Sequence, residues 1–378
     1  MPPKFQPAFL FCTCQQGAGP ALKAEVAAAV PGAVPAFSRP GFVTFKLEEP
    51  LENPSAFTLK SAFARSWSLS LVNVRDEPRE GLVAGVRSSE PLAQFIADHR
   101  PKQLHVWERD RAQAGEHDFE PGPTETAAAV RNALLDGWDA FSHDQGDKRS
   151  DWIVDVVIVD ESDWWVGCHR ANTRAARWAG GVPAITLPEH AVSRAYLKMD
   201  EALRWSAFPA EQEDLWVELG CAPGGASQAL LDRGMIVVGV DPAEVDPKVA
   251  EHPRFAHARR RVKELPTKWL REVQWLAADM NVAPTYTLDA VEGVLAHRAS
   301  TIRGLVLTLK LSDWSAAEHL QEHADRVRSW GYRDLRIRQL AFNRREVCLV
   351  ALRSRGQRRV RRGGRKSAAT KPILSESD

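Results

Sequence analysis

Short apolar runs alternate with helix-like stretches through the second half of this 378-residue chain. The runs that we expect to be strands are residues 215–219, 235–240, 273–278, 303–311, 332–341 and 346–352. The stretches that we expect to be helices are residues 226–233, 288–298 and 316–329. This alternation predicts an α/β fold in which helices cover both faces of a parallel sheet. Only the polar segment FNRR separates the last two strands, which predicts an antiparallel hairpin at the sheet edge.

The first half of the chain is less regular. Strands are expected at residues 8–14, 41–47, 152–159 and 164–169, and helices at residues 21–30, 91–96 and 125–138. This mixture indicates a smaller α+β region, and the Gly-Gly-Val-Pro segment at 180–183 marks a hinge after it. We therefore expect an N-terminal region over 1–180, a linker over 181–192, an α/β domain over 193–353 and a tail over 354–378.

Composition limits the class of protein. The chain has no apolar run of 18 residues and no basic leader followed by an apolar stretch, so a cytoplasmic protein without a membrane segment is expected. Its five cysteines are odd in number and scattered, which favours neither disulfides nor a zinc site, and we expect no metal. The net charge of +1 hides a basic tail that is rich in Arg and Gly. That tail is expected to be disordered, and either contacts nucleic acid or serves as a solubilising end.

The segment VELGCAPGGASQALLDRG, residues 217–234, joins an expected strand to an expected helix through a glycine-rich turn. Glycines allow a ligand to lie against main chain that a Cβ would block. Open α/β sheets bind ligands at this end of their strands. The spacing matches neither the triphosphate loop nor the dinucleotide fingerprint, which disfavours both kinds of nucleotide site.

Two acids accompany the turn. Glu218 precedes it and suits a positively charged amino group, whereas Asp241 ends the next strand and suits the two hydroxyls of a ribose, or is only a solvated carboxylate. A ligand with adenine, ribose and an ammonium but no phosphate is S-adenosylmethionine. Cys221 is expected to pack as a small residue. The expected cofactor-binding residues are Glu218, Gly220, Cys221, Ala222, Pro223, Gly224, Gly225, Ser227, Asp241 and Asp279.

The run ELGCAPGGAS at residues 218–227 resembles the first cofactor motif of the FtsJ-type RNA ribose 2′-O-methyltransferases. The resemblance extends over about residues 190–353. It implies a Rossmann-like class I S-adenosylmethionine-dependent methyltransferase domain with a Lys-Asp-Lys-Glu tetrad. The matching positions are Lys198 in SRAYLKMDEAL, Asp279 in WLAADM, Lys310 in LVLTLKL and Glu346 in NRREVCLVAL.

A closer resemblance is to those family members that methylate a cytidine of large-subunit (23S) ribosomal RNA and carry a THUMP-containing N-terminal half. It implies that residues 1–180 are a THUMP-like RNA-binding region. Arg170, Arg174 and Arg177 are then either RNA contacts or part of a solvated helix face. The chain departs from the family at Arg259 and Arg260, where an acid usually meets the adenine. An RNA-binding or ribosome-assembly protein with a decayed methyltransferase domain therefore stays an alternative.

The tetrad suits methyl transfer to a sugar hydroxyl, because a 2′-hydroxyl is a poor nucleophile until it begins to lose its proton. A positioned base contributes roughly 10²–10⁴-fold to such a reaction. We expect Lys310 to meet the hydroxyl and, when neutral, to take its proton. In the other arrangement Lys310 stays charged and orients the hydroxyl, while Asp279 accepts its hydrogen bond.

Overall fold

The structure is a computed structural model that describes residues 5–49, 51–141, 151–270, 272–298 and 302–354. The chain divides into two compact units, Met1–Ala184 and Ile185–Asp378. Each unit contains its own seven-stranded sheet. The expected tail over 354–378 lies outside the described residues, apart from Ser354.

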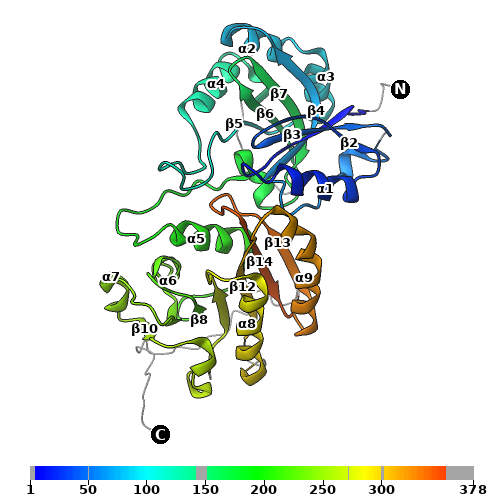
Figure 1. The fold of residues 1–378 in the computed structure, drawn as a ribbon. Helices are drawn as coiled ribbons and strands as arrows, with labels where there is room; N and C mark the ends of the chain where they lie inside the picture. The colour runs from blue at the N-terminus through cyan, green and yellow to red at the C-terminus, as the bar shows by residue number, and fades with distance from the viewer. Residues whose placement is uncertain (1–4, 50, 142–150, 271, 299–301, 355–378) are drawn as a thin grey trace. The chain divides into compact units, whose positions relative to one another are not determined.

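The first unit is an α+β region with the strand order β2-β3-β1-β4-β7-β6-β5. Its strands are β1 Phe9–Thr13, β2 Ala33–Arg39, β3 Phe42–Leu47, β4 Ser66–Arg75, β5 Gln103–Glu108, β6 Trp152–Asp160 and β7 Asp163–Arg170. Its α-helices are α1 Gly19–Ala29, α2 Arg79–Arg87, α3 Glu90–His99 and α4 Glu125–Leu135. Short 3-10 helices lie at Pro54–Ala56, Asp139–Phe141, Ala175–Arg177 and Ala179–Gly181. Neighbouring strands are antiparallel except β5 and β6, which are parallel (Figure 1).

Aromatic side chains fill part of the core of the first unit. The rings of Phe11, Phe42 and Trp165 lie about 6 Å apart, centre to centre, and are joined by Val157 and Val159. Strand β6 is buried over its first eight residues. A β-branched run such as WIVDVVIV is expected where both faces of a strand are covered.

The second unit contains an open, mostly parallel sheet with the order β10-β9-β8-β11-β12-β14-β13. Its strands are β8 Leu215–Leu219, β9 Ile236–Val240, β10 Phe255–Ala258, β11 Trp275–Ala278, β12 Gly304–Lys310, β13 Asp334–Arg338 and β14 Glu346–Leu352. Its α-helices are α5 Ala195–Ser206, α6 Gly225–Leu231, α7 Pro247–Ala250, α8 Pro284–Arg298 and α9 Leu320–Ser329. The remaining short helices lie at Val262–Glu264, Thr267–Leu270 and Trp314–His319.

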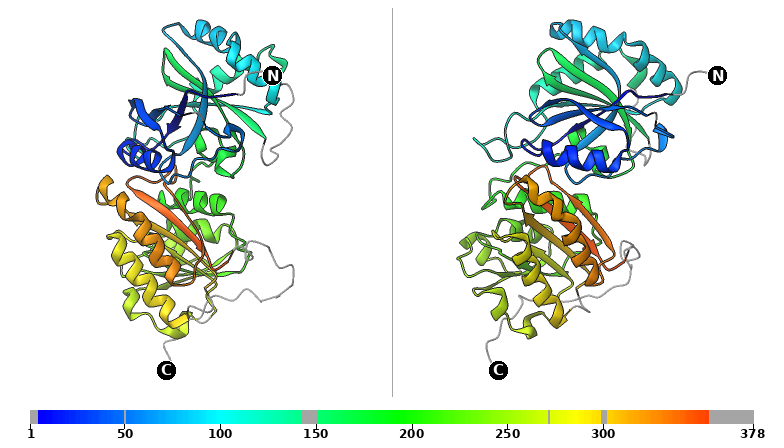
Figure 2. Two further views of the ribbon diagram at one scale, coloured as in Figure 1. Left: turned by 90° about the vertical axis from the view of Figure 1, so that its right-hand side faces the viewer. Right: turned by 45° about the vertical axis from the view of Figure 1, so that its right-hand side comes forward.

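Helices cover both faces of this second sheet, as the sequence predicts. In Figures 1 and 2, α8 and α9 lie side by side on one face, and α5 and α6 lie on the other. The last two strands do pair antiparallel, but β14 lies between β12 and β13, so that β13 forms this edge of the sheet and β14 lies one strand inside it.

The strand order reverses direction between β8 and β11. From β8 the chain runs outward through β9 to β10 and then returns to β11 on the other side of β8. Loops at the carboxyl ends of β8 and β11 therefore diverge, and such a switch point is where open α/β sheets bind ligands.

All five cysteines are buried free thiols.

None of the helices in the described parts of the chain has the length and apolar character needed to cross a membrane.

Candidate active site

The glycine-rich turn lies at the switch point, directly against the segment that follows β11. Gly220 has a φ of +79°, and a Cβ on it would lie 2.9 Å from the carbonyl oxygen of Asp279 and 3.1 Å from the Cα of Met280. The amide of Asp279 donates to the carbonyl of Leu219 at 3.1 Å. A side chain at residue 220 is thus excluded both by the backbone conformation and by contact with main chain.

The first residue of α6 also packs against main chain. A Cβ on Gly225 would lie 2.2 Å from Ser193 Oγ and 2.8 Å from the Ser193 carbonyl oxygen. Gln228 on the same helix accepts from the amide of Val192 at 3.0 Å and donates to the carbonyl of His190 at 2.9 Å. These contacts fix the chain that leads into α5 beside the turn.

Three carboxylates gather at the ends of neighbouring strands around the turn. Glu218 is buried and accepts from the hydroxyl of Ser227, and Asp241 accepts from the amides of Ala222 at 3.2 Å and Ala243 at 2.8 Å. Burial is the main cause that raises the pKa of Glu218 to about 8, and the charges of Asp279 and Asp241 contribute in the same direction. A positively charged ligand would offset this concentration of negative charge around Glu218, so the site suits a cation.

The other residues of the turn have different surroundings. The thiol of Cys221 points into the sheet, because a Cβ on Gly239 would lie 2.7 Å from its Sγ. Pro223 is exposed, and Gly224 has a φ of +119°. Cys221 therefore packs as a small buried residue, as its place in the sequence predicts.

The four predicted tetrad residues come from four separate segments and meet in one cluster. Lys198 Nζ lies 2.7 Å from Asp279 Oδ2 and 3.1 Å from Glu346 Oε1. Lys310 Nζ lies 3.2 Å from Asp279 Oδ1 and 3.0 Å from Glu346 Oε2. Each ammonium thus faces both carboxylates, and each carboxylate divides its two oxygens between the two ammonium groups.

The two lysines differ in access to solvent. The side chain of Lys198 is 13% exposed, whereas that of Lys310 is 25% exposed. Burial alone would lower the pKa of Lys198, but the charges of Asp279 and Glu346 raise it above its ordinary value. Burial alone would raise the pKa of Glu346, but Lys198 and Lys310 lower it to about 2. Lys198 and Glu346 are therefore both charged at neutral pH, and Lys310 is the ammonium closer to the surface.

Sheet register and helix docking position the cluster. In the antiparallel pair of β12 and β14, Lys310 lies directly opposite Glu346. Lys198 comes from α5, one turn before the fully buried Glu201. The carboxylate of Glu201 accepts from the amides of Ala341 at 2.9 Å and Phe342 at 3.2 Å. Sequence motifs did not indicate Glu201, and the helix that carries it was not among the expected helices.

The two arginines at the unusual position after β10 have partners on the protein. Arg259 Nη1 lies 3.1 Å from Glu244 Oε1, and both side chains are exposed. The guanidinium of Arg260 lies over the ring of Trp269, at 4.6 Å from its centre. In the first unit, Arg170 lies over the ring of Trp152 at 4.5 Å and donates to the carbonyl of Ser55 at 3.3 Å. Arg170 is thus part of the packing of that unit.

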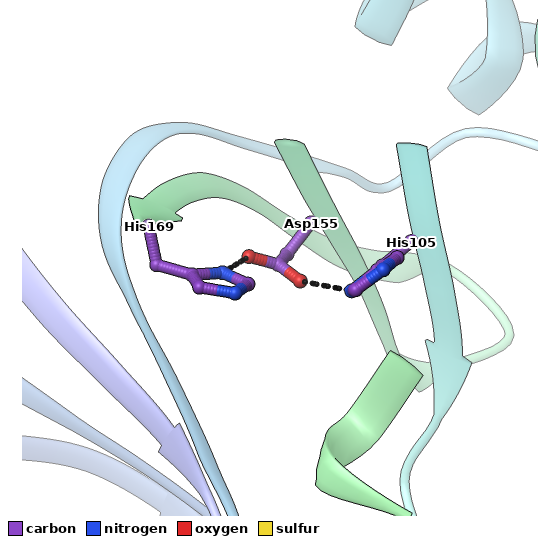
Figure 3. Close-up of side chains that lie close together, drawn as sticks. All are labelled: His105, Asp155 and His169. Carbon is purple, nitrogen blue, oxygen red and sulfur yellow. Dashed lines mark hydrogen bonds and ion pairs between the residues drawn. The ribbon is translucent and has the colours of Figure 1, made fainter. Parts of the chain in front are cut away.

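A second polar cluster, which the sequence did not indicate, lies in the first unit. His105, Asp155 and His169 come from β5, β6 and β7, and both imidazoles face the one carboxylate (Figure 3). His169 Nδ1 lies 2.5 Å from Asp155 Oδ2, and His105 Nδ1 lies 3.5 Å from Asp155 Oδ1. Two tetrahedral ligands of one zinc ion, each at about 2.1 Å, are roughly 3.4 Å apart. The contact between His169 and Asp155 is shorter than that, so we interpret it as a direct hydrogen bond.

Both ring nitrogens of His169 face hydrogen-bond acceptors. Its Nε2 lies 2.6 Å from the carbonyl oxygen of Ala176, and its Nδ1 faces the carboxylate of Asp155. Burial alone would lower the pKa of His169, but Asp155 and the hydrogen bond to Ala176 raise it above its ordinary value. The cluster therefore favours a charged imidazolium, which joins β7 to the segment around residue 176.

Residues 191–325 match the FtsJ-like methyltransferase family. A relative named ribosomal RNA large subunit methyltransferase M, from Teredinibacter turnerae, is 33% identical over 172 residues, which cover 43% of this chain and 47% of the relative. The protein of that name from Halorhodospira halophila is 30% identical over 188 residues, with coverages of 48% and 53%. The one from Saccharophagus degradans is 26% identical over 302 residues, with coverages of 75% and 80%. The chain thus spans about half the length of the first two relatives. Over residues 191–325, this chain is therefore similar to the FtsJ-like methyltransferase family.

Proposed function

We propose that this chain is an S-adenosylmethionine-dependent enzyme that methylates the 2′-hydroxyl of a ribose in RNA, with a cytidine of 23S ribosomal RNA as its target. The observation that carries the proposal is the cluster of Lys198, Asp279, Lys310 and Glu346 beside a turn where Gly220 contacts Asp279. The names of the relatives support ribosomal RNA as the substrate class.

The residues around the turn fit the cofactor. Gly220 and Gly225 let the turn pack directly against Asp279 and Ser193, and the three carboxylates beside the turn provide partners for a molecule with a sulfonium and an ammonium. Asp241 suits the ribose hydroxyls and Glu218 the ammonium group. S-adenosylmethionine supplies a methyl group that is already activated, so the protein's task is to prepare the acceptor.

The greater exposure of Lys310 supports the proposal that it meets the substrate 2′-hydroxyl. Asp279 and Glu346 hold its ammonium in place, and Lys198 balances their charge from the buried side. Lys310 takes the hydroxyl proton when it is neutral. In the other arrangement it stays charged and orients the oxygen, while Asp279 accepts the hydrogen bond.

We assign RNA binding to the N-terminal region over residues 1–180, as a THUMP-like region with Arg174 and Arg177 as contacts. The segment that carries both arginines is joined to β7 through the hydrogen bond between His169 and Ala176. Because the proposed substrate is ribosomal RNA, we place the protein in the cytoplasm.

The test is methylation of 23S ribosomal RNA from cells that lack this protein, with labelled S-adenosylmethionine and mapping of the methylated ribose. We expect one methylated cytidine, and no product from Lys310→Met. An Arg at position 310 cannot act as a base near neutral pH. Near-native turnover by Lys310→Arg at neutral pH would therefore exclude Lys310 as the base and favour the charged arrangement. RNA binding without detectable cofactor binding at millimolar concentration would instead identify an RNA-binding protein with a decayed methyltransferase domain.

A further inference from the structure

A buried carboxylate on α5 connects the helix that carries Lys198 to the segment that carries Glu346. Glu201 is 0% exposed and lies three residues after Lys198, so both side chains project from the same side of the helix. Each of its two oxygens accepts one main-chain amide, from Ala341 and from Phe342. The helix therefore holds the segment before β14 at two consecutive residues.

That segment is a closed turn that leads into Glu346. The amide of Leu340 donates to Asn343 Oδ1 at 2.8 Å, and the amide of Asn343 donates back to the carbonyl of Leu340 at 3.1 Å. Asn343 is itself fully buried, and its Nδ2 lies 3.4 Å from Glu346 Oε1, the oxygen that also contacts Lys198. A chain of hydrogen bonds thus runs from Glu201 through the turn to the carboxylate of Glu346.

We propose that Glu201 is a positioning residue for the methyl-transfer site: it sets the placement of Glu346 relative to Lys198 through the turn over residues 340–343. The inference rests on the proposed function. Because Lys198 and Glu201 belong to one rigid helix, any shift of α5 would move the ammonium and the anchor of the carboxylate together. The distance between Lys198 and Glu346 is then kept although the two residues are 148 positions apart.

Glu201→Gln is the first test. The amide group of Gln places an N–H donor against one of the two main-chain donors, so the turn loses one of its two anchors. We expect kcat to fall roughly 10- to 100-fold, since small misplacements of catalytic groups have effects of that size. The KM values for S-adenosylmethionine and RNA are expected to change less than about threefold, because Glu201 touches neither.

A matched control lies at the neighbouring position. Asp200 is also a buried carboxylate on α5, but it pairs with Arg204 and Arg233 and not with the turn. Asp200→Asn is expected to lower stability while it keeps kcat close to that of the wild type. Equal losses of kcat in the two variants would reduce Glu201 to a general structural role and overturn the proposal. If Glu201→Gln does not fold, Glu201→Asp, which keeps the charge but shortens the reach, takes its place.

A double variant shows whether Glu201 acts through Glu346. In a Glu346→Gln background, Glu201→Gln is expected to cost little further activity; a full additional loss would sink the inference. Hydrogen exchange separates this result from the proposed function. Exchange at the amides of Ala341 and Phe342 is expected to speed up in Glu201→Gln and not in Asp200→Asn, whether or not the chain methylates RNA. Unchanged exchange at these two amides would overturn the inference even for an active enzyme.

Discussion

Replacement of Glu346 by Gln gives a stability change that can be worked out from the cluster. Glu346 has a pKa lowered from 4.5 to about 2 by the two ammonium groups that face it. Because a tenfold change in an equilibrium constant corresponds to about 1.4 kcal/mol, the ion pairs of Glu346 stabilise the second unit by about 3 kcal/mol at pH 7. Glu346→Gln is expected to lose about that amount, since Lys198 and Lys310 then share Asp279 alone.

The pH dependence provides the sharper check. A carboxyl group whose pKa is lowered by folding contributes stability that is complete above the unfolded pKa of 4.5 and is lost as the pH falls through the folded pKa of about 2. The difference in free energy of unfolding between wild type and variant should therefore shrink to roughly half by pH 3. Effects of other acids largely cancel in this difference.

The assay is denaturation in urea, with unfolding monitored by hydrogen exchange in peptides from β12 and β14. These peptides report on the second unit alone. Asp325→Asn is a suitable control, because Asp325 pairs with Arg328 on the exposed surface of α9. We expect no measurable change for that variant. A Glu346→Gln protein with wild-type stability at pH 7, or a difference that does not depend on pH, would refute the electrostatic account of the cluster.

Three further predictions address the turn and the first unit. Gly220→Ala should lower stability by about 1–3 kcal/mol and weaken binding of S-adenosylmethionine in calorimetry, because its φ of +79° and the 2.9 Å approach to Asp279 both exclude a Cβ. Burial raises the pKa of Glu218 to about 8, so the wild-type fold loses stability as the pH rises from 4.5 to 8 and this acid must ionise. The free energy of unfolding of Glu218→Gln should therefore rise relative to that of wild type over this range. A difference between the two proteins that does not change with pH would contradict this prediction. His169→Gln should destabilise the first unit most below pH 6.5 and least at high pH. Because the pKa of His169 is raised in the folded protein, the stabilisation by its imidazolium is lost as the pH rises through that pKa. Hydrogen exchange in β6 and β7 measures the loss of stability.

Sequence pattern predicted the second unit better than the first. The bounds of β8 and β14 agree with the expected strands, because short apolar runs between polar turns have few alternatives there. Strand β10 was missed, since FAHA is only four residues long and contains a histidine. Strand β2 was missed because it contains Pro35. The sheet accepts that proline because β2 is an edge strand, where a missing amide costs no ladder bond.

Strand β4 was also missed, although its sequence has the alternation typical of a strand. Its sequence SWSLSLVNVR alternates polar and apolar residues over most of its length, which is the pattern of a strand with one covered face.

Some of the site residues were identified from the sequence and others were not. Lys198, Asp279, Lys310 and Glu346 were identified through motifs that each lie within a short segment, and the structure brings all four together. Glu201 has no motif of its own, since its partners are main-chain amides 140 and 141 residues away. The His105, Asp155 and His169 cluster was missed for a related reason: three strands contribute one residue each, and no spacing along the chain reveals their meeting.

The antiparallel pairing of β12 and β14 determines where this protein can tolerate changes of length. Side chains alternate between the two faces of a strand, so one residue inserted near the start of β14 would turn the carboxylate of residue 346 away from Lys310. Arg344 and Arg345 are exposed, but they lie between Asn343 and Glu346 and so carry the same constraint. Length variation among natural or engineered versions of this domain should therefore be absent both from the paired strands and from the residues that connect the turn over 340–343 to Glu346.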